Sequence, residues 1–217
     1  MAGLLEKDFR IIFTRKQALL MMTLICLFMA GSTDGSFIVG FMSILGVTLS
    51  IGTISYDDLD NGMSFLMTLP ISRKTYVKEK YVFISAVALV FWVIASIVYV
   101  AFEVYKGEGL EPMNMALAAL TFIPFIFLVL DIMVPIELKF GAQKSRIALF
   151  ILAGAMAAIV MFGLRMIDGM KEEMWNSFKW ITSIQLPILV GIIAAITIVI
   201  TIISYLISQR IMANKEF

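Results

Sequence analysis

The chain has 217 residues, of which 61% are hydrophobic and 15% are charged, and its mean hydropathy is +0.97. Soluble domains contain about 45–50% apolar and about 25% charged residues, so this composition indicates an integral membrane protein. The net charge of +1 argues against nucleic-acid binding, and the absence of histidine excludes histidine-based triads, haem ligation by histidine and the usual zinc sites.

Residues 1–16 precede the first apolar run, and 3–16 are predicted to form an amphipathic helix. Its apolar side chains recur at helical spacing on one face: Leu5, Phe9, Ile12 and Phe13. Glu6 and Arg10 lie one turn apart on the other face. Such a helix can lie in the headgroup plane of a membrane, and an ordinary cytosolic lead-in is the alternative.

Six apolar segments follow, and each is predicted to cross the membrane as a helix. They are residues 17–32, 37–55, 81–105, 115–136, 147–167 and 186–207. Pro124 and Pro135 interrupt the fourth segment and Pro187 the sixth, which favours kinks there. The connections are too short to hold a soluble domain, so residues 1–217 are predicted to form one all-α membrane domain with six spans.

The basic residues predict the orientation of these spans. Four segments hold thirteen of the seventeen Lys and Arg: 1–16, 56–80, 137–146 and 208–217. By the positive-inside rule, both termini and residues 56–80 are expected in the cytoplasm. The opposite connections form an acidic outer mouth with six carboxylates: Asp34, Glu108, Glu111, Asp168, Glu172 and Glu173. Residues 170–181 are predicted to form a short outer helix anchored by aromatic side chains.

Residues 56–80 are the longest polar interruption in the chain. They begin with Asp57, Asp58 and Asp60 and end with a cluster of cations after Pro70. Between them lies an apolar stretch of about ten residues, which is too short to span a bilayer. Its apolar side chains are Met63, Leu66, Met67 and Leu69. We expect a small helix on the cytoplasmic side whose apolar face fills a groove of another protein.

The local sequence predicts how this small helix is mounted. The three aspartates would stand at its N-terminus, where the helix dipole favours negative charge. Pro70 would end it, and Ser72 would cap the next helix. A solvated loop is the alternative, but it does not explain an apolar stretch placed in water with no domain to cover it.

Charged residues inside predicted spans are costly and are therefore candidates for function. Asp131 lies in the fourth span. It either faces a transport pathway or a partner helix, or it is hydrogen-bonded to a neighbouring helix near the cytoplasmic edge. Glu103 and Arg165 lie near the outer ends of their spans, where they can reach water or pair with each other.

Motifs for nucleotide binding and for common hydrolytic chemistry are missing from the sequence. It contains no P-loop, no HExxH and no GxSxG. An intramembrane aspartyl protease would need a second buried aspartate beside Asp131. The sequence therefore predicts no cofactor bound by this chain and no enzymatic site.

Two stretches carry a resemblance to a known family. The first is Asp57-Asp58 … Gly62 … Leu69-Pro70-Ile71-Ser72-Arg73 … Tyr76-Val77 … Lys80-Tyr81. The second is Val134-Pro135-Ile136 … Lys139-Phe140-Gly141 … Lys144-Ser145-Arg146. Together they resemble bacterial ABC-2-type transporter permeases, in particular small six-helix members such as the membrane subunits of phenol-soluble-modulin exporters. The likeness covers essentially the whole chain.

The resemblance implies a permease that pairs with a second permease chain, identical or different, and with two separate P-loop ATPase subunits that bind ATP and Mg. It implies that the N-terminal helix is an elbow helix, that short outer helices precede the last span, and that the small helix after the second span is a coupling helix. The residues implied in ATPase contact are Asp57, Asp58, Asp60, Gly62, Met63, Leu66, Met67, Leu69, Pro70 and Arg73. The second cytoplasmic loop, 137–146, departs from the family pattern by being very short.

Three hypotheses follow. The favoured one is the membrane half of an ATP-driven exporter in the bacterial cell membrane, with an amphipathic or cationic substrate such as a membrane-active peptide or toxin. The second is an ATP-independent secondary transporter with Asp131 as the titrating group, although no inverted repeat is visible. The third is a membrane-embedded enzyme or assembly factor, which the missing histidines and unpaired acids disfavour.

Overall fold

The computed structural model describes residues 1–32, 35–59, 62–107, 112–141 and 186–215, with scattered positions between 144 and 162. The elements in the continuous ranges are α-helices, which confirms the predicted all-α class. They are α1 (Ala2–Thr14), α2 (Lys16–Ser32), α3 (Gly35–Asp58), α4 (Gly62–Thr68), α5 (Arg73–Lys106), α6 (Pro112–Leu120), α7 (Phe122–Phe140) and α10 (Leu186–Ala213).

Among the described residues, four helices are long and apolar enough to cross a membrane. They cover Phe37–Asp58, Arg73–Lys106, Met115–Phe140 and Gly191–Ala213. A fifth span results only if α1 and α2 are taken together across the 66° bend between them. The 17 residues of α2 give a helix of about 25 Å, short of the roughly 30 Å hydrocarbon core. The predicted span 147–167 lies largely outside the described residues, so the count of six stays a prediction.

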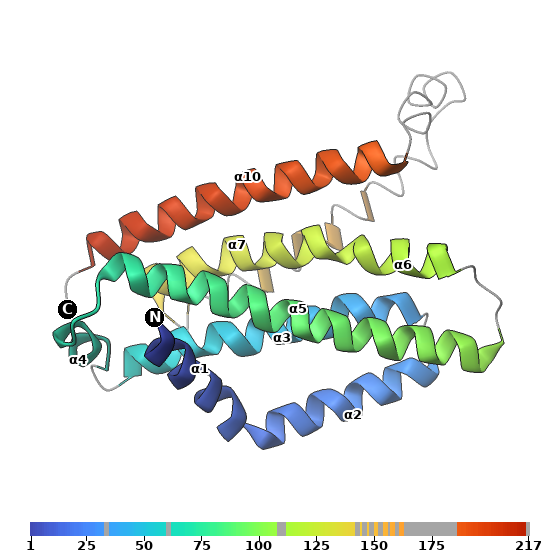
Figure 1. The fold of residues 1–217 in the computed structure, drawn as a ribbon, viewed down its shortest axis with the longest axis horizontal. Coiled ribbons are helices and arrows are strands. Elements are labelled where there is room, and N and C mark those ends of the chain that lie inside the picture. Colours follow the sequence, from blue (N-terminus) through green and yellow to red (C-terminus); the bar gives the residue numbers. More distant parts are fainter. Residues whose placement is uncertain are drawn as a thin grey trace.

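Helix α3 lies at the centre of the bundle and packs against α5 and α7, while α10 covers α7 and α5 from the far side (Figure 1). The contact between α3 and α7 is close at Gly40, where an added Cβ would lie 2.5 Å from the ring of Phe122. Both chain termini and α4 lie at the same end of the molecule, which we call the α4 end (Figure 1). Helix α1 starts against the bundle at this end, and the junction between α1 and α2 lies away from it (Figure 1).

The boundaries of α5 follow from its caps. Ser72 is the N-cap, and its hydroxyl accepts a hydrogen bond from the backbone N–H of Thr75 at 3.1 Å, as the sequence predicts. Gly107 ends the helix in the left-handed conformation, at φ 70°. Helix α5 is therefore longer than the predicted span 81–105, because the polar residues from Arg73 onward continue the same helix.

The two prolines of the fourth span act differently. Pro124 has no N–H to bond the carbonyl four residues earlier, and α6 ends at that residue, Leu120, before α7 begins at Phe122. Pro135 lies inside α7 without ending it. Pro135 frees the carbonyl of Asp131 by the same rule, and the hydroxyl of Ser204 on α10 donates to that carbonyl at 2.5 Å.

Candidate functional site

Helix α4 follows α3 along the chain and lies at one end of the bundle (Figure 1). It begins at Gly62, where an added Cβ would lie 3.0 Å from the backbone carbonyl oxygen of Asp57, so α4 starts close against the end of α3. It ends at Thr68, two residues before Pro70. The predicted small helix is thus present, as seven residues rather than about ten. Asp60 lies outside the described residues.

The two faces of α4 have different surroundings. Met63 and Leu66 are 2% and 8% exposed and belong to the main hydrophobic core of this chain, and Met67 packs against the same core. Phe65, in contrast, is 70% exposed, and Leu69, directly after the helix, is 43% exposed. The expectation that Met63, Leu66 and Met67 face a partner is therefore corrected, because those side chains attach α4 to its own bundle.

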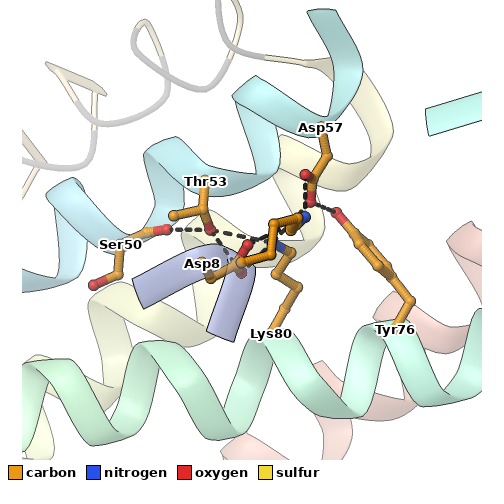
Figure 2. Close-up of polar contacts among 7 residues, drawn as sticks. Asp8, Ser50, Thr53, Asp57, Tyr76 and Lys80 are labelled. Atoms are coloured by element: carbon orange, nitrogen blue, oxygen red, sulfur yellow. Dashed lines mark hydrogen bonds and ion pairs between the residues drawn. The ribbon is translucent and has the colours of Figure 1, made fainter. Parts of the chain in front are cut away.

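Asp57 also differs from expectation. It lies in the last turn of α3 rather than at the start of α4, and it is buried. The dipole of α4 is therefore not its partner. Its carboxylate faces two cations and a hydroxyl: it is ion-paired with Lys7 of α1 and with Lys80 of α5, the latter at 2.8 Å, and it accepts a hydrogen bond from the Tyr76 hydroxyl at 3.0 Å (Figure 2).

Asp8 completes this arrangement from the N-terminal helix. It is fully buried and ion-paired with Lys80, which is fully buried too. Its second oxygen lies 3.2 Å from the ammonium of Lys7. The Thr53 hydroxyl, on α3, donates to Asp8 at 3.2 Å and accepts from Lys80 at 3.2 Å (Figure 2). We call Lys7, Asp8, Asp57 and Lys80 the charge cluster.

The charge cluster joins α1, α3 and α5 through two cations and two carboxylates. Buried charges are tolerated when they are paired and hydrogen-bonded, and the loss of one partner leaves an uncompensated charge. Burial alone would lower the pKa of Lys7, but the neighbouring carboxylates of Asp57 and Asp8 outweigh it and raise that pKa. Glu79, beside Lys80, is buried as well, and its oxygens accept no hydrogen bond within the described residues.

Asp8, Lys7 and Lys80 were not singled out from the sequence as site residues. A signal was present for Asp8, because Leu4, Asp8 and Ile12 are spaced one helical turn apart and all three are buried. The predicted apolar face of this helix is only partly buried, and Phe13 is largely exposed. A carboxylate at the spacing of a packed face therefore marked the side of α1 that contacts the bundle.

Two further contacts tie the segment 56–80 to the end of α10. The guanidinium of Arg73, the first residue of α5, donates to the carbonyls of Met212 at 3.2 Å and Ala213 at 2.6 Å. The ammonium of Lys215 lies 3.2 Å from the carboxylate of Asp58. The exposed residues Leu69 and Pro70 connect α4 to α5.

Asp131 lies away from this segment, between α7 and α10. It is buried, and one carboxylate oxygen accepts a hydrogen bond from the Thr201 hydroxyl at 2.8 Å. The other oxygen has no hydrogen-bond partner within the described residues. Glu103 is buried near the far end of α5, and the expected pairing with Arg165 stays a prediction because Arg165 lies outside the described residues.

The part of the chain that the structure describes contains no group of three Cys, Asp or Glu placed to hold a metal ion. The groups described at the α4 end form ion pairs, a helix cap and an exposed apolar patch.

Comparison with known proteins identifies the chain. The family described as ABC-2 family transporter protein matches residues 3–213, which run from α1 to the end of α10. No curated protein and no solved structure matches. The match confirms the resemblance carried by the two sequence motifs, and the apolar helices of spanning length agree with a multi-pass membrane protein. The chain belongs to the ABC-2 family of transporter proteins.

Proposed function

We propose that this chain is the permease subunit of an ATP-driven exporter in a bacterial cell membrane. Two permease chains would form the transmembrane path, and two P-loop ATPase subunits would bind ATP and Mg on the cytoplasmic side, where both termini lie. The observation that supports this most directly is α4, a short helix on which Phe65 is exposed and which Leu69, also exposed, directly follows. Within the described residues, no segment of this chain covers the side chain of Phe65, which is 70% exposed.

Helix α4 is attached firmly enough to pass a push to the bundle. Its inner residues, Met63 and Leu66, share a core cluster with Tyr76 and Val77 in the first turns of α5. The connection is tight, since the N–H of Ile71 bonds the carbonyl of Leu69 at 2.6 Å. A displacement applied at Phe65 would therefore move α4 and the start of α5 together.

The charge cluster would extend this movement to α1 and α3. Lys80 is held by Asp8 of α1 and by Asp57 of α3, so three helices that are distant in sequence share one buried cation. In this proposal α1 is the elbow helix, and it moves with α5 rather than floating independently in the headgroup plane.

The proposed substrate is amphipathic, such as a membrane-active peptide. It rests on the family resemblance and on the acidic outer connections of the sequence.

The neighbouring residues Phe65 and Leu66 offer a matched test, because one is exposed and the other is buried. We expect Phe65→Asp to leave the thermal stability of the purified permease unchanged while abolishing co-purification with its ATPase subunit and substrate-stimulated ATP hydrolysis. We expect Leu66→Asp to lower thermal stability, because it places a charge in the core.

Tyr105→Asp is the control, since Tyr105 is an exposed aromatic residue at the far end of α5. It should leave ATPase binding intact. If the Phe65→Asp permease still binds the ATPase and still stimulates hydrolysis, α4 is not the coupling helix.

A further inference from the structure

The end of α10 is fastened to the segment that carries α4. Arg73 donates hydrogen bonds to the carbonyls of Met212 and Ala213, and Lys215 pairs with Asp58 at the end of α3. Met212 is fully buried in the same core cluster as Met63 and Leu66 of α4. The last turn of α10 is therefore joined to α4 by the shared core and to the start of α5 by hydrogen bonds.

The position of Arg73 is informative because it is unfavourable for its own helix. Arg73 is the first residue of α5, where the helix dipole is positive and disfavours a cation. The C-terminus of α10 has the opposite polarity and presents carbonyls without intrahelical donors, which a guanidinium can satisfy. The side chain of Arg73 therefore stabilises the C-terminus of α10 rather than the N-terminus of α5.

The exposed charges of these elements are mostly basic, with Asp58 as an exposed carboxylate among them. Lys74 and Lys78 are exposed in the first turns of α5, and Arg210 is exposed in the last turn of α10. These cations and the exposed Phe65 of α4 belong to elements that meet at the same end of the molecule. A partner that fits such a surface has an apolar groove with an acidic rim.

We propose that the C-terminal end of α10 is a second part of the surface on which the ATPase subunit docks, and that Arg73 is the residue that positions it there. This inference rests on the proposed function and adds the last span to the elements that the ATPase moves. It gives the ATPase a contact beyond α4 in a chain whose other loop at this end, 137–146, is very short. Arg210 would meet the acidic rim of the ATPase groove directly.

Two variants test the inference in permease dimers reconstituted in phosphatidylcholine nanodiscs, by the affinity of the purified ATPase subunit. We expect Arg210→Glu to weaken that affinity by about tenfold, with unchanged thermal stability, because a contact becomes repulsive.

We expect Arg73→Ala to weaken the affinity for the ATPase subunit similarly and to speed hydrogen exchange of the amides in residues 210–215. Arg73→Lys should restore the affinity only in part, because an ammonium does not match the guanidinium fork. Lys106→Glu, at the far end of α5, is the control and should change nothing.

The outcomes separate this inference from the proposed function. If Phe65→Asp abolishes ATPase binding while Arg210→Glu and Arg73→Ala leave the affinity unchanged, α4 is the docking site and the inference about α10 is wrong. If all three variants bind normally, both fail. The same nanodiscs prepared with phosphatidylglycerol examine the competing partner for a basic surface. If Arg210→Glu alters only the association with this anionic lipid and not ATPase affinity, the surface faces the membrane and the inference is again overturned.

Discussion

The charge cluster at the α4 end and the Asp131 site between α7 and α10 both bury carboxylates, but their partners differ in kind. In the cluster, Asp8 and Asp57 each face the ammonium groups of Lys7 and Lys80. At the second site, Asp131 accepts a hydrogen bond from the Thr201 hydroxyl, and no cation pairs with it within the described residues. One site is an ionic junction, and the other is a polar contact between two helices.

This difference predicts how each site responds to substitution. Removal of Lys80 leaves the two buried carboxylates with Lys7 as the one remaining cation of the cluster, and α1, α3 and α5 lose a shared partner. Neutralisation of Asp131 removes no ion pair that the described residues form, and the hydrogen bond from Ser204 to its backbone carbonyl does not depend on the side chain. The cluster should therefore be intolerant of neutral replacements, and the Asp131 site should tolerate them.

The largest effect is expected for Lys80→Met. The variant leaves Asp8 and Asp57 with one cation between them, Lys7, next to the buried Glu79, and should lower the stability of the fold by about 3–5 kcal/mol. Thermal unfolding in detergent would show this loss as a lower melting temperature. Lys78→Met is the matched control, because Lys78 is exposed on the same helix two positions earlier.

The addition of Asp8→Asn to Lys80→Met sharpens the test. It removes one of the two carboxylates that share Lys7, so that Asp57 pairs with that cation alone, and it should recover part of the lost stability. A Lys80→Met permease as stable as the Lys78→Met control would show that the cluster does not hold the three helices together.

A smaller effect is expected for Asp57→Asn, and a still smaller one for Asp58→Asn. Asp57 is buried against Lys7 and Lys80, so the amide should cost about 1.5–3 kcal/mol in stability, while Lys80 keeps Asp8 as a partner. The side chain of Asp58 is 42% exposed and pairs with Lys215, and such a pair contributes about 0–1 kcal/mol. Chemical unfolding of the two variants side by side would measure the difference, and equal stabilities would contradict the assignment of Asp57 to a buried junction.

Much of the α4 end could be predicted from local sequence. The apolar stretch, Pro70 and Ser72 predicted a short helix, a stop and a cap, because these signals act over a few residues. The inward face of α4 could not be predicted in the same way. Met63 and Leu66 form one apolar stripe and Phe65 and Leu69 another, and helical spacing alone does not say which stripe meets the bundle.

The charge cluster depends on contacts that local sequence does not encode. Helix α4 and the first two turns of α5 separate Asp57 from Lys80 along the chain. Asp8 comes from a helix that precedes the first apolar run. The pairing of these residues follows from how α1, α3 and α5 pack against one another. Local sequence shows only that Asp57 lies near the start of α4, and it therefore predicts the dipole of that helix as its partner. The same limit applied to Arg73, whose partners are backbone carbonyls about 140 residues later in the chain.

The smallest effect on folding is expected for Asp131→Asn, which also distinguishes an ATP-driven permease from a gradient-driven carrier. Asparagine has nearly the same shape and keeps an oxygen that can accept from Thr201, so the stability should change by less than about 1 kcal/mol. If ATP hydrolysis by a partner drives export, the variant should still transport substrate in proteoliposomes that contain the ATPase subunit. Thr201→Val is the control for the hydrogen bond itself and should behave in the same way. If Asp131→Asn folds normally but transports nothing, while Thr201→Val is active, then the charge of Asp131 and not its hydrogen bond is required. Asp131 would then take part in transport through its charge. The interpretation of its site as only a polar contact between two helices would be wrong.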